Sequence, residues 1–247
     1  MFTCRTGCPG STPGHARPAA PRVAGVPADF LEATRASYDT IATAYTERFP
    51  NRPSDGHPLD RALIGAFAGL AGAHAPAPVA DLGSGPGSVT AHLHGLGLTV
   101  FGVDLSPGMV ALARRTHPAL RFHVGSMTAL DLPDGTLGGI VALYSTIHLP
   151  DERLSEACAE MARVLRPGAP VLLAFQSGDA EARMHLAERF GRDVDLTYHW
   201  RTPEAVAARL TEAGLRVTAR TVREPVGEER RPRAFLLAER PDGVTSR

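Results

Sequence analysis

Residues 79–93 read VADLGSGPGSVTAHL, and this stretch decides the fold. An apolar segment containing one acid, Asp81, leads into Gly83, Gly85 and Gly87, and a helical pattern follows. A glycine turn between a strand and a helix lets the backbone approach a ligand closely. The helix behind the turn then offers free N–H groups and a positive dipole end. The stretch therefore predicts a nucleotide site at the first strand of an open parallel sheet.

Strands and helices alternate on both sides of this turn. The pattern predicts strands at 79–83, 99–104, 120–125, 139–145, 170–176, 216–223 and 234–239. It predicts helices at 28–49, 59–73, 87–95, 107–116, 151–165 and 203–213. Such alternation is typical of an α/β fold. We expect a Rossmann-like, doubly wound and mostly parallel seven-stranded sheet with an antiparallel C-terminal strand.

The composition divides the chain into three parts. Residues 1–27 are rich in Pro, Gly and Ala, and we expect a disordered leader there. Residues 28–241 form the single predicted domain, and 242–247 form a tail. The domain begins with two helices at 28–75. It carries an insertion at 178–203, whose aromatic and polar residues suit either a substrate pocket or a hairpin anchored to the surface.

Charge and cysteine content exclude several classes of function. The 26 basic residues are all arginine and balance 26 acids, so the net charge argues against a nucleic-acid partner. A chain without lysine forms no lysine Schiff base and lacks the lysine of a Walker A loop. Cys4, Cys8 and Cys158 show no disulfide framework, which favours a reducing, cytoplasmic setting. No apolar run has the roughly 20 residues that span a bilayer, so we expect no membrane association.

Asp104 narrows the choice of nucleotide. It ends the second predicted strand about 20 residues beyond the glycines, where an acid accepts hydrogen bonds from ribose hydroxyls. The third glycine, Gly87, falls one place too early for the dinucleotide pattern, and the Asp81 carboxylate would repel a diphosphate. Both features favour S-adenosyl-L-methionine, which carries a sulfonium and an ammonium, over NAD. An equally weighted role for Asp81 is to hold the glycine loop by backbone hydrogen bonds.

Four stretches occur in the order of a known family's motifs. They are VADLGSGPG, VFGVDLSPGMVALAR, LRFHVGSMTALDLPDGTLGGIVALYSTIHLPD and VLRPGAPVLLAFQ. Over residues 28–241 the chain resembles class I S-adenosylmethionine-dependent methyltransferases (type 11/25-like). It is most similar to the small-molecule branch of actinobacterial natural-product pathways. The resemblance implies methyl transfer to a small organic acceptor, with oxygen ahead of nitrogen and carbon, and S-adenosyl-L-homocysteine as product. An NAD-dependent oxidoreductase and a non-catalytic S-adenosylmethionine-binding protein are the alternatives.

The resemblance also implies a set of cofactor-binding residues. Tyr38 would cap the cofactor from a lid helix within residues 28–75. Leu105 and Met109 would press on the adenine or simply pack in the core. Ser126 stands where many family members have an acid. The full set is Tyr38, Asp81, Gly83, Ser84, Gly85, Gly87, Asp104, Leu105, Met109, Ser126, Met127, Tyr144 and Ser145.

The candidate catalytic residues follow the fourth predicted strand. Tyr144 is expected beside the transferable methyl, and His148 four residues later is a candidate general base or a structural histidine. His148, Tyr198 and Trp200 are the candidate acceptor-binding residues. No metal site is expected, because His185, Asp195 and His199 are too loosely spaced. The segment YSTIHLPD lacks the tetrapeptide of nucleic-acid methyltransferases, so we expect a small-molecule acceptor. We also expect a monomer or a homodimer.

Overall fold

The computed structural model describes residues 30–49, 57–178 and 182–242. The predicted leader at 1–27, with Cys4 and Cys8, lies outside these residues, as does all of the predicted tail except Asp242. The elements up to the fourth strand are α1 (Phe30–Arg48), α2 (Pro58–Gly72), β1 (Val79–Leu82), α3 (Ser88–Gly95), β2 (Val100–Asp104), α4 (Pro107–Thr116), β3 (Arg121–Val124) and β4 (Gly139–Leu143). The later ones are the 3₁₀ turn η1 (Thr146–His148), α5 (Asp151–Val164), β5 (Pro170–Gln176), β6 (Arg183–Arg189), β7 (Arg192–His199), α6 (Pro203–Glu212), β8 (Arg216–Arg223) and β9 (Arg233–Glu239).

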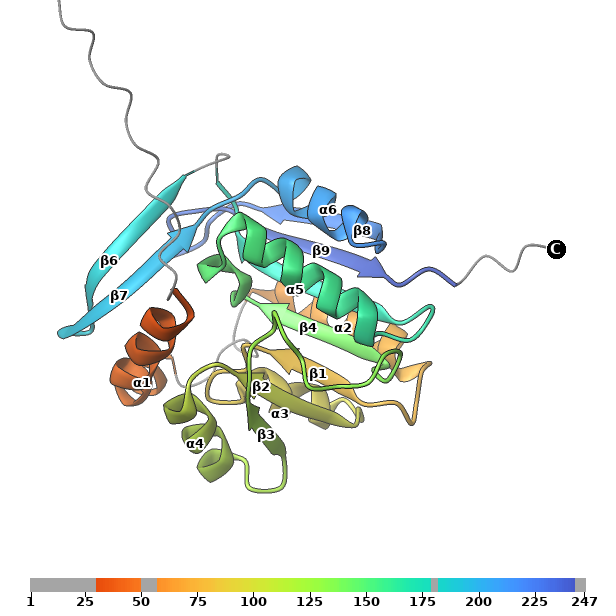
Figure 1. Cartoon of the computed structure of the whole chain (residues 1–247), viewed down its shortest axis with the longest axis horizontal. Helices are drawn as coiled ribbons and strands as arrows, with labels where there is room; N and C mark the ends of the chain where they lie inside the picture. The colour runs from red at the N-terminus through yellow and green to blue at the C-terminus, as the bar shows by residue number, and fades with distance from the viewer. Residues whose placement is uncertain (1–29, 50–56, 179–181, 243–247) are drawn as a thin grey trace, which may run out of the picture.

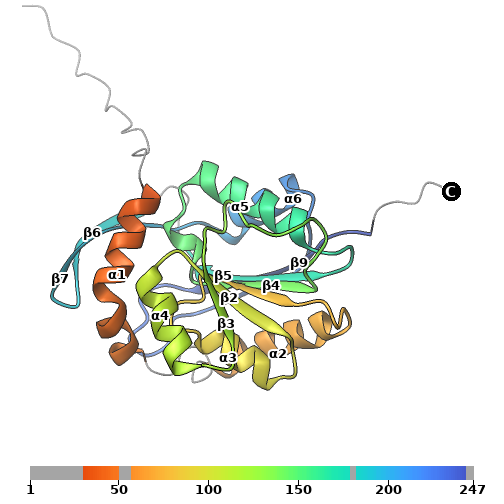
Figure 2. The same ribbon diagram turned by 60° about the horizontal axis from the view of Figure 1, so that its bottom comes forward.

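Seven strands form one sheet in the order β3-β2-β1-β4-β5-β9-β8 (Figure 1). The first five strands in this order run parallel, and β9 runs antiparallel to both of its neighbours. Helices α5 and α6 cover one face of the sheet, and α2, α3 and α4 lie on the other (Figure 2). This arrangement confirms the predicted doubly wound, mostly parallel sheet.

The central strands are apolar because helices cover both of their faces. Every residue of β1 and β4 is buried, as are six of the seven residues of β5. Parallel strands covered on both sides show such unbroken apolar runs. The edge strand β3 buries only Phe122. The chain therefore places its most hydrophobic strands at the middle of the sheet, where they fix the positions of the loops that follow them.

The strand order reverses next to β1, which pairs with β2 on one side and β4 on the other. At such a switch point the loops after the two neighbouring strands separate and leave a crevice at their carboxyl ends. The glycine turn follows β1, Asp104 ends β2, and Tyr144 follows β4. Residues far apart in sequence thus meet at one end of the sheet.

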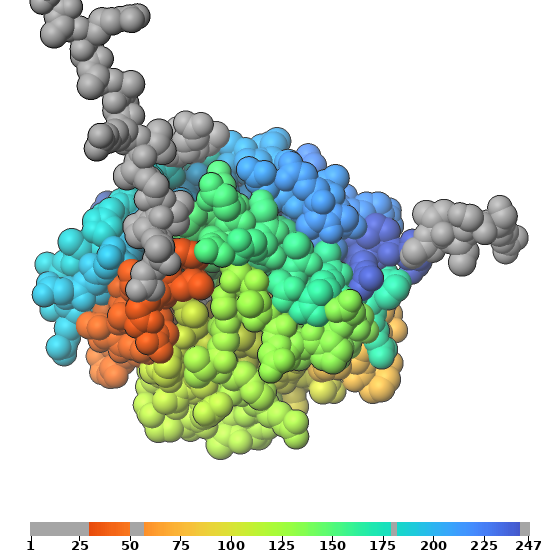
Figure 3. Space-filling view, in the orientation of Figure 1, coloured from red at the N-terminus to blue at the C-terminus, as the bar shows by residue number. Residues whose placement is uncertain are grey.

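Helix α1 and the hairpin β6–β7 lie beyond the layers of the sheet, at this same end (Figures 1 and 2). The hairpin forms its own two-stranded sheet within the predicted insertion. Its tip, Phe190 and Gly191, has positive φ values of 55° and 69°. In the space-filling view, α1 lies against both the hairpin and α4 (Figure 3). None of the described helices combines the length and the apolar character needed to cross a bilayer.

Candidate functional site

A cleft opens at the carboxyl ends of β1, β2 and β4, beneath α1. It holds a cavity of about 120 Å³. The predicted site residues that line it are Tyr38, Gly83, Gly85, Asp104, Leu105, Met109, Ser126, Met127, Tyr144, Ser145 and His148. Phe30, Leu31, Thr34, Tyr45, Val103, Gly125, Leu143 and Leu149 complete the lining. The structure thus brings most of the predicted residues together in one place.

The glycine turn after β1 forms the wall nearest the sheet. Gly83 and Gly85 have positive φ values of 74° and 51°, a conformation that side-chain-bearing residues rarely adopt. A Cβ on Gly83 would lie 2.2 Å from the Cβ of Ser145. The Ser145 hydroxyl in turn donates to the Leu82 carbonyl oxygen at 2.7 Å. The turn is therefore packed against the end of β4, and only glycine fits at position 83.

Asp104 links the glycine turn to the start of α4. Its Oδ2 accepts a hydrogen bond from the Gly85 N–H at 2.7 Å, and its Oδ1 accepts one from the Ser106 N–H at 2.9 Å. Burial raises the pKa of this carboxyl, and the two backbone donors counteract part of that rise. Each oxygen keeps lone pairs for further donors. A buried acceptor that faces the cleft is suited to bind hydroxyl groups of a ligand.

Asp81 lies under the glycine turn rather than in the cleft lining. Its Oδ2 accepts a hydrogen bond from the Thr90 hydroxyl at 2.7 Å, and the Thr90 backbone N–H also donates to the carboxyl. The N-cap of α3, Gly87, has no side chain to cap the helix, so Asp81 supplies the cap from β1. Burial raises the pKa of Asp81 to about 7. The carboxyl group thus occupies the helix terminus that would otherwise attract a phosphate.

Two other predicted cofactor residues also lie outside the lining of the cleft. The buried Ser84 hydroxyl has no hydrogen-bond partner in the described part of the chain. The Ser84 hydroxyl packs against Gly102, and a Cβ added to Gly102 would lie 2.6 Å from Ser84 Oγ. Gly87 faces Phe122, whose ring would lie 2.6 Å from an added Cβ. The structure thus places both residues within the turn, outside the residues that line the cleft.

The wall formed by the loops after β2 and β3 is mostly apolar. Leu105, Met109 and Met127 line it, and Met109 also belongs to the fully buried core. The Ser126 hydroxyl pairs with the Thr128 hydroxyl at 2.8 Å and accepts the Thr128 N–H at 3.2 Å. Ser126 is therefore held by its own loop, although it still lines the cleft.

His148 is buried and uses both ring nitrogens. Its Nδ1 donates to the Thr197 carbonyl oxygen at 3.0 Å, so in the neutral ring Nε2 accepts the Tyr38 hydroxyl at 2.7 Å. Burial lowers the pKa of His148 to about 4. Burial also raises the pKa of Tyr38 far above its usual value. At neutral pH His148 is therefore an uncharged link between α1 and β7, and its acceptor nitrogen is occupied.

Tyr144 has a strained backbone at the end of β4. Its φ of 58° is uncommon for a residue with a large side chain, and such outliers cluster at functional sites. The ring contacts Phe235 edge-on at 6.5 Å, and the Arg233 guanidinium lies 5.6 Å from the ring centre. Burial raises the pKa of the Tyr144 hydroxyl. Tyr144 thus lies between the cleft and a cluster of charged groups.

Helix α1 contributes cleft residues that the motifs alone did not identify. Phe30, Leu31 and Thr34 line the cleft, and Thr34 lies one helical turn after the adjacent pair, as on one face of an amphipathic helix. Asp39 fastens the helix to the N-terminus of α4 by accepting the Ser106 hydroxyl at 2.5 Å and the Gly108 N–H at 2.7 Å. Such a carboxylate complements the positive end of the α4 dipole.

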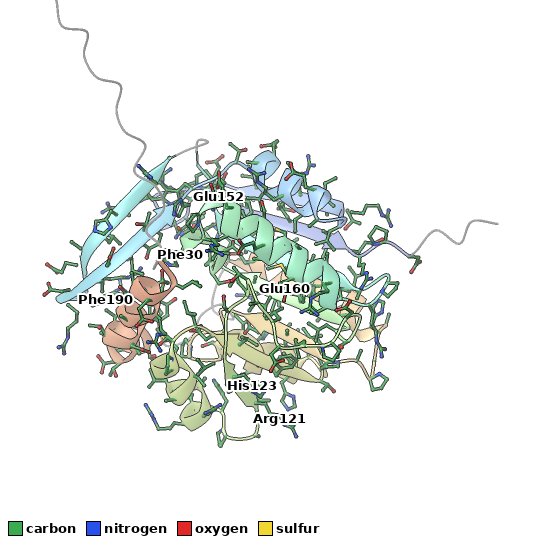
Figure 4. The ribbon with its side chains drawn as sticks, viewed as in Figure 1. Phe30, Arg121, His123, Glu152, Glu160 and Phe190 are labelled. Carbon is green, nitrogen blue, oxygen red and sulfur yellow. The ribbon has the colours of Figure 1, made fainter. Side chains whose placement is uncertain are left out.

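The two predicted acceptor residues of the hairpin lie outside the cleft lining. The Tyr198 ring packs edge-on against His148 at 4.6 Å, and its hydroxyl accepts a hydrogen bond from Arg189. Trp200 follows β7 and stacks under the Arg231 guanidinium at 3.5 Å. Figure 4 shows Phe30 and Phe190 on the same side of the molecule, where α1 faces the hairpin. Among the described residues no group of three histidine, cysteine or acidic side chains could hold a metal ion.

Comparisons with known proteins agree with this geometry. Residues 79–168 match the model of a methyltransferase domain. An O-methyltransferase, cnsE of Penicillium expansum, is 37% identical over 103 residues, which cover 39% of this chain and 37% of that protein. A demethylmenaquinone methyltransferase of Beutenbergia cavernae is 35% identical over 119 residues, 47% of this chain and 48% of that protein. The chain thus spans about half or less of the length of these two relatives.

Solved structures resemble this chain over more of its length. The [4+2]-cyclase SpnF superimposes with a TM-score of 0.68 at 16% identity and covers 89% of this chain and 100% of its own. Magnesium protoporphyrin IX methyltransferase from Synechocystis PCC 6803, with S-adenosylmethionine bound, gives 0.61 at 16% identity, with coverages of 88% and 100%. These likenesses show the Rossmann-like methyltransferase fold. Together with the domain match they support S-adenosyl-L-methionine as the cofactor.

Proposed function

We propose that this protein is a cytoplasmic S-adenosylmethionine-dependent methyltransferase that methylates an oxygen of a small organic acceptor. The observation that carries the proposal is the placement of two acids at the glycine turn. Asp104 faces the cleft with its backbone donors in place, and Asp81 occupies the N-terminus of α3. A diphosphate cofactor needs that helix terminus. A cofactor with a ribose and a positive charge needs acids around it.

The cleft residues fit the parts of such a cofactor. Asp104 would accept the ribose hydroxyls, and Leu105, Met109 and Met127 would contact the adenine. Gly83 and Gly85 would lie under the methionine portion, and Ser126, Ser145 and Tyr144 complete the site. Asp81, Ser84 and Gly87 would support the turn from behind. When bound, S-adenosylmethionine supplies the methyl group from its sulfonium.

In this proposal Tyr38 and His148 act as a pair. Methyl transfer in line from a sulfonium mainly requires a positioned acceptor and exclusion of water. Tyr38 lines the cleft, and its hydroxyl is held by His148 Nε2. The low pKa and the occupied nitrogen of His148 favour positioning of Tyr38 over general-base catalysis. Tyr144, Tyr198 and Trp200 would lie on the acceptor side.

The choice of oxygen as the methylated atom and the place in secondary metabolism belong to the proposal. Support for oxygen comes from the O-methyltransferase of Penicillium expansum, which matches part of this chain. The neutral net charge supports a small acceptor over a nucleic acid. A monomer or homodimer satisfies the proposal equally, because every residue invoked above lies on one chain.

Binding calorimetry tests the cofactor, and mass spectrometry tests the reaction. We expect saturable binding of S-adenosylmethionine and S-adenosylhomocysteine and none of NAD. Incubation with S-adenosylmethionine and a panel of phenols and carboxylic acids should yield products heavier by one methylene unit. Binding of NAD in preference to S-adenosylmethionine would refute the proposal. Cofactor binding without transfer to any acceptor of the panel would favour the non-catalytic alternative.

A further inference from the structure

We propose that the acceptor carries a carboxylate, which binds Arg231 and the indole N–H of Trp200 next to Tyr144. This inference rests on the proposed function, because it identifies the chemical class of the acceptor for the same site. It arises from a group of side chains at the ends of β5, β7 and β9 that the cofactor does not explain.

Tyr144 connects this group to the cleft. The tyrosine lines the cleft, and the Arg233 guanidinium lies 5.6 Å from its ring centre. Arg233 Nη1 donates to the Arg231 carbonyl oxygen at 3.2 Å. The Arg231 guanidinium then stacks on Trp200 at 3.5 Å. Tyr144 and Arg233 thus lead from the cleft to the backbone of Arg231, and the Arg231 side chain reaches Trp200.

The two described carboxylates beside these arginines, Asp60 and Glu229, are already paired. Asp60 binds Arg223 through both of its oxygens at 2.6 and 2.7 Å. Glu229 also binds Arg223, at 2.6 Å, and lies 3.2 Å from Arg233 Nε. Arg231 has no acidic partner among residues 30–49, 57–178 and 182–242. Among the described residues, Arg223 and Arg233 thus share the two carboxylates, and Arg231 is left without one.

Trp200 places a hydrogen-bond donor beside the unpaired guanidinium of Arg231. Its Nε1–H is inaccessible to solvent and has no hydrogen-bond partner in the described part of the chain. A buried donor without a partner destabilises the folded protein, so a bound acceptor atom would relieve that cost. A stacked guanidinium keeps its in-plane N–H groups free for a planar carboxylate.

Gly178 makes room for the stacking. A Cβ at this position would lie 2.7 Å from Arg231 Nη1 and 2.9 Å from Trp200 Cβ. Any larger residue would push the guanidinium off the indole ring. Gly178, which follows β5, therefore allows Arg231 to stack on Trp200. These three residues come from separate segments of the chain that meet only in the folded protein.

The only tryptophan of the chain reports on this site directly. We would titrate benzoate into the full-length protein saturated with S-adenosylhomocysteine, and follow Trp200 fluorescence. Benzamide, a neutral molecule of the same shape, is the matched ligand. We expect a saturable change with benzoate and binding of benzamide weaker by about tenfold or more, since a charged hydrogen-bonded pair is lost. Equal binding of the two ligands, or no binding of benzoate, would overturn the inference.

Arg231→Gln tests the residue, and Arg220→Gln on the exposed face of β8 is its control. The Arg231 variant should bind benzoate about tenfold more weakly, and the control should bind it as the wild type does. Unchanged benzoate affinity in the Arg231 variant refutes the assignment. Calorimetry of S-adenosylhomocysteine should be the same for all three proteins. If S-adenosylhomocysteine does not bind the wild-type protein, the proposed function is wrong, regardless of the benzoate result.

Discussion

Asp104 is the side chain on which cofactor affinity should depend most. Asp104→Ala removes the acceptor for the ribose hydroxyls and releases the Gly85 and Ser106 N–H groups. We expect S-adenosylmethionine binding to weaken by about 1–3 kcal/mol, the usual cost of losing charged hydrogen bonds. Calorimetry measures the change. Asp193→Ala, an exposed acid of the hairpin, is the control. Unchanged affinity in a folded Asp104 variant would remove this residue from the site.

His148 should act through Tyr38. His148→Gln retains one donor and one acceptor, so turnover should stay within about tenfold, whereas loss of a true general base costs about 10²–10⁴-fold. Tyr38→Phe removes the other half of the pair and should produce a similar loss. The pH profile of kcat, measured for both variants and the wild type, decides between the roles. An acid limb that disappears only in the His148 variant would restore the general-base hypothesis.

At the scale of the element, helix α1 is a cap that three consecutive residues fasten in three directions. The Ser37 hydroxyl accepts the Asp195 N–H at 2.8 Å, Tyr38 binds His148, and Asp39 binds the start of α4. Because α1 covers the cleft, a ligand that enters or leaves must loosen these contacts or pass around them. The strength of these three contacts should therefore set how long the cofactor stays bound.

Asp39→Ala tests this role of α1. The variant should speed amide hydrogen exchange in α1 while leaving the central strands unchanged, because local opening is governed by local contacts. It should also shorten the residence time of S-adenosylhomocysteine by about fivefold or more, as expected for a lost charged hydrogen bond. Thr40→Ala, on the exposed side of the same helix, is the matched control. Faster exchange throughout the sheet would instead show a general loss of stability.

The sequence predicts those elements whose signals are local. The glycine turn, Asp104 and the apolar central strands were all predicted, because motif and periodicity act within a few residues. The partners of His148 were not, because Tyr38 and Thr197 lie 110 and 49 residues away. The hairpin shows the same limit. Its sequence suits either a substrate pocket or an anchored surface hairpin, and only its packing on α1 places it beside the cleft.

At the scale of the whole molecule, a net charge of zero conceals a separation of charges. Asp39, Asp81 and Asp104 are close enough that Asp39 raises the pKa of Asp104, and Asp104 raises that of Asp81. Arg223, Arg231 and Arg233 gather on the other side of Tyr144 with the acids Asp60 and Glu229, so basic groups outnumber acidic ones among these side chains. The end of the sheet is thus acidic where a cationic cofactor would bind and basic where an anionic acceptor would bind. Because the chain has equal numbers of acidic and basic residues, its composition alone does not reveal this separation of charges.

Asp81 should make the stability of the whole protein depend on pH. Its pKa is about 7 in the folded chain and 3.8 as a reference value, so folding favours the protonated form. Asp81 therefore contributes stability below about pH 4, and this contribution is lost as the pH rises to about 7. Asp81→Asn cannot ionise. We expect its unfolding free energy, relative to the wild type, to rise across this range by up to about 4 kcal/mol.

Urea unfolding of the two proteins across the range of pH measures this difference. The pKa of His148 is lowered in the folded state, so its own contribution is lost as the pH falls from about 6.5 to about 4. That contribution is common to both proteins and cancels when they are compared. Asp193→Asn, at an exposed acid of the hairpin, is the control. Parallel curves for the Asp81 variant and the wild type would mean that this carboxyl is ionised in the folded protein. Asp81 would then cap α3 as an anion, and the acidity of the cofactor end would be greater still.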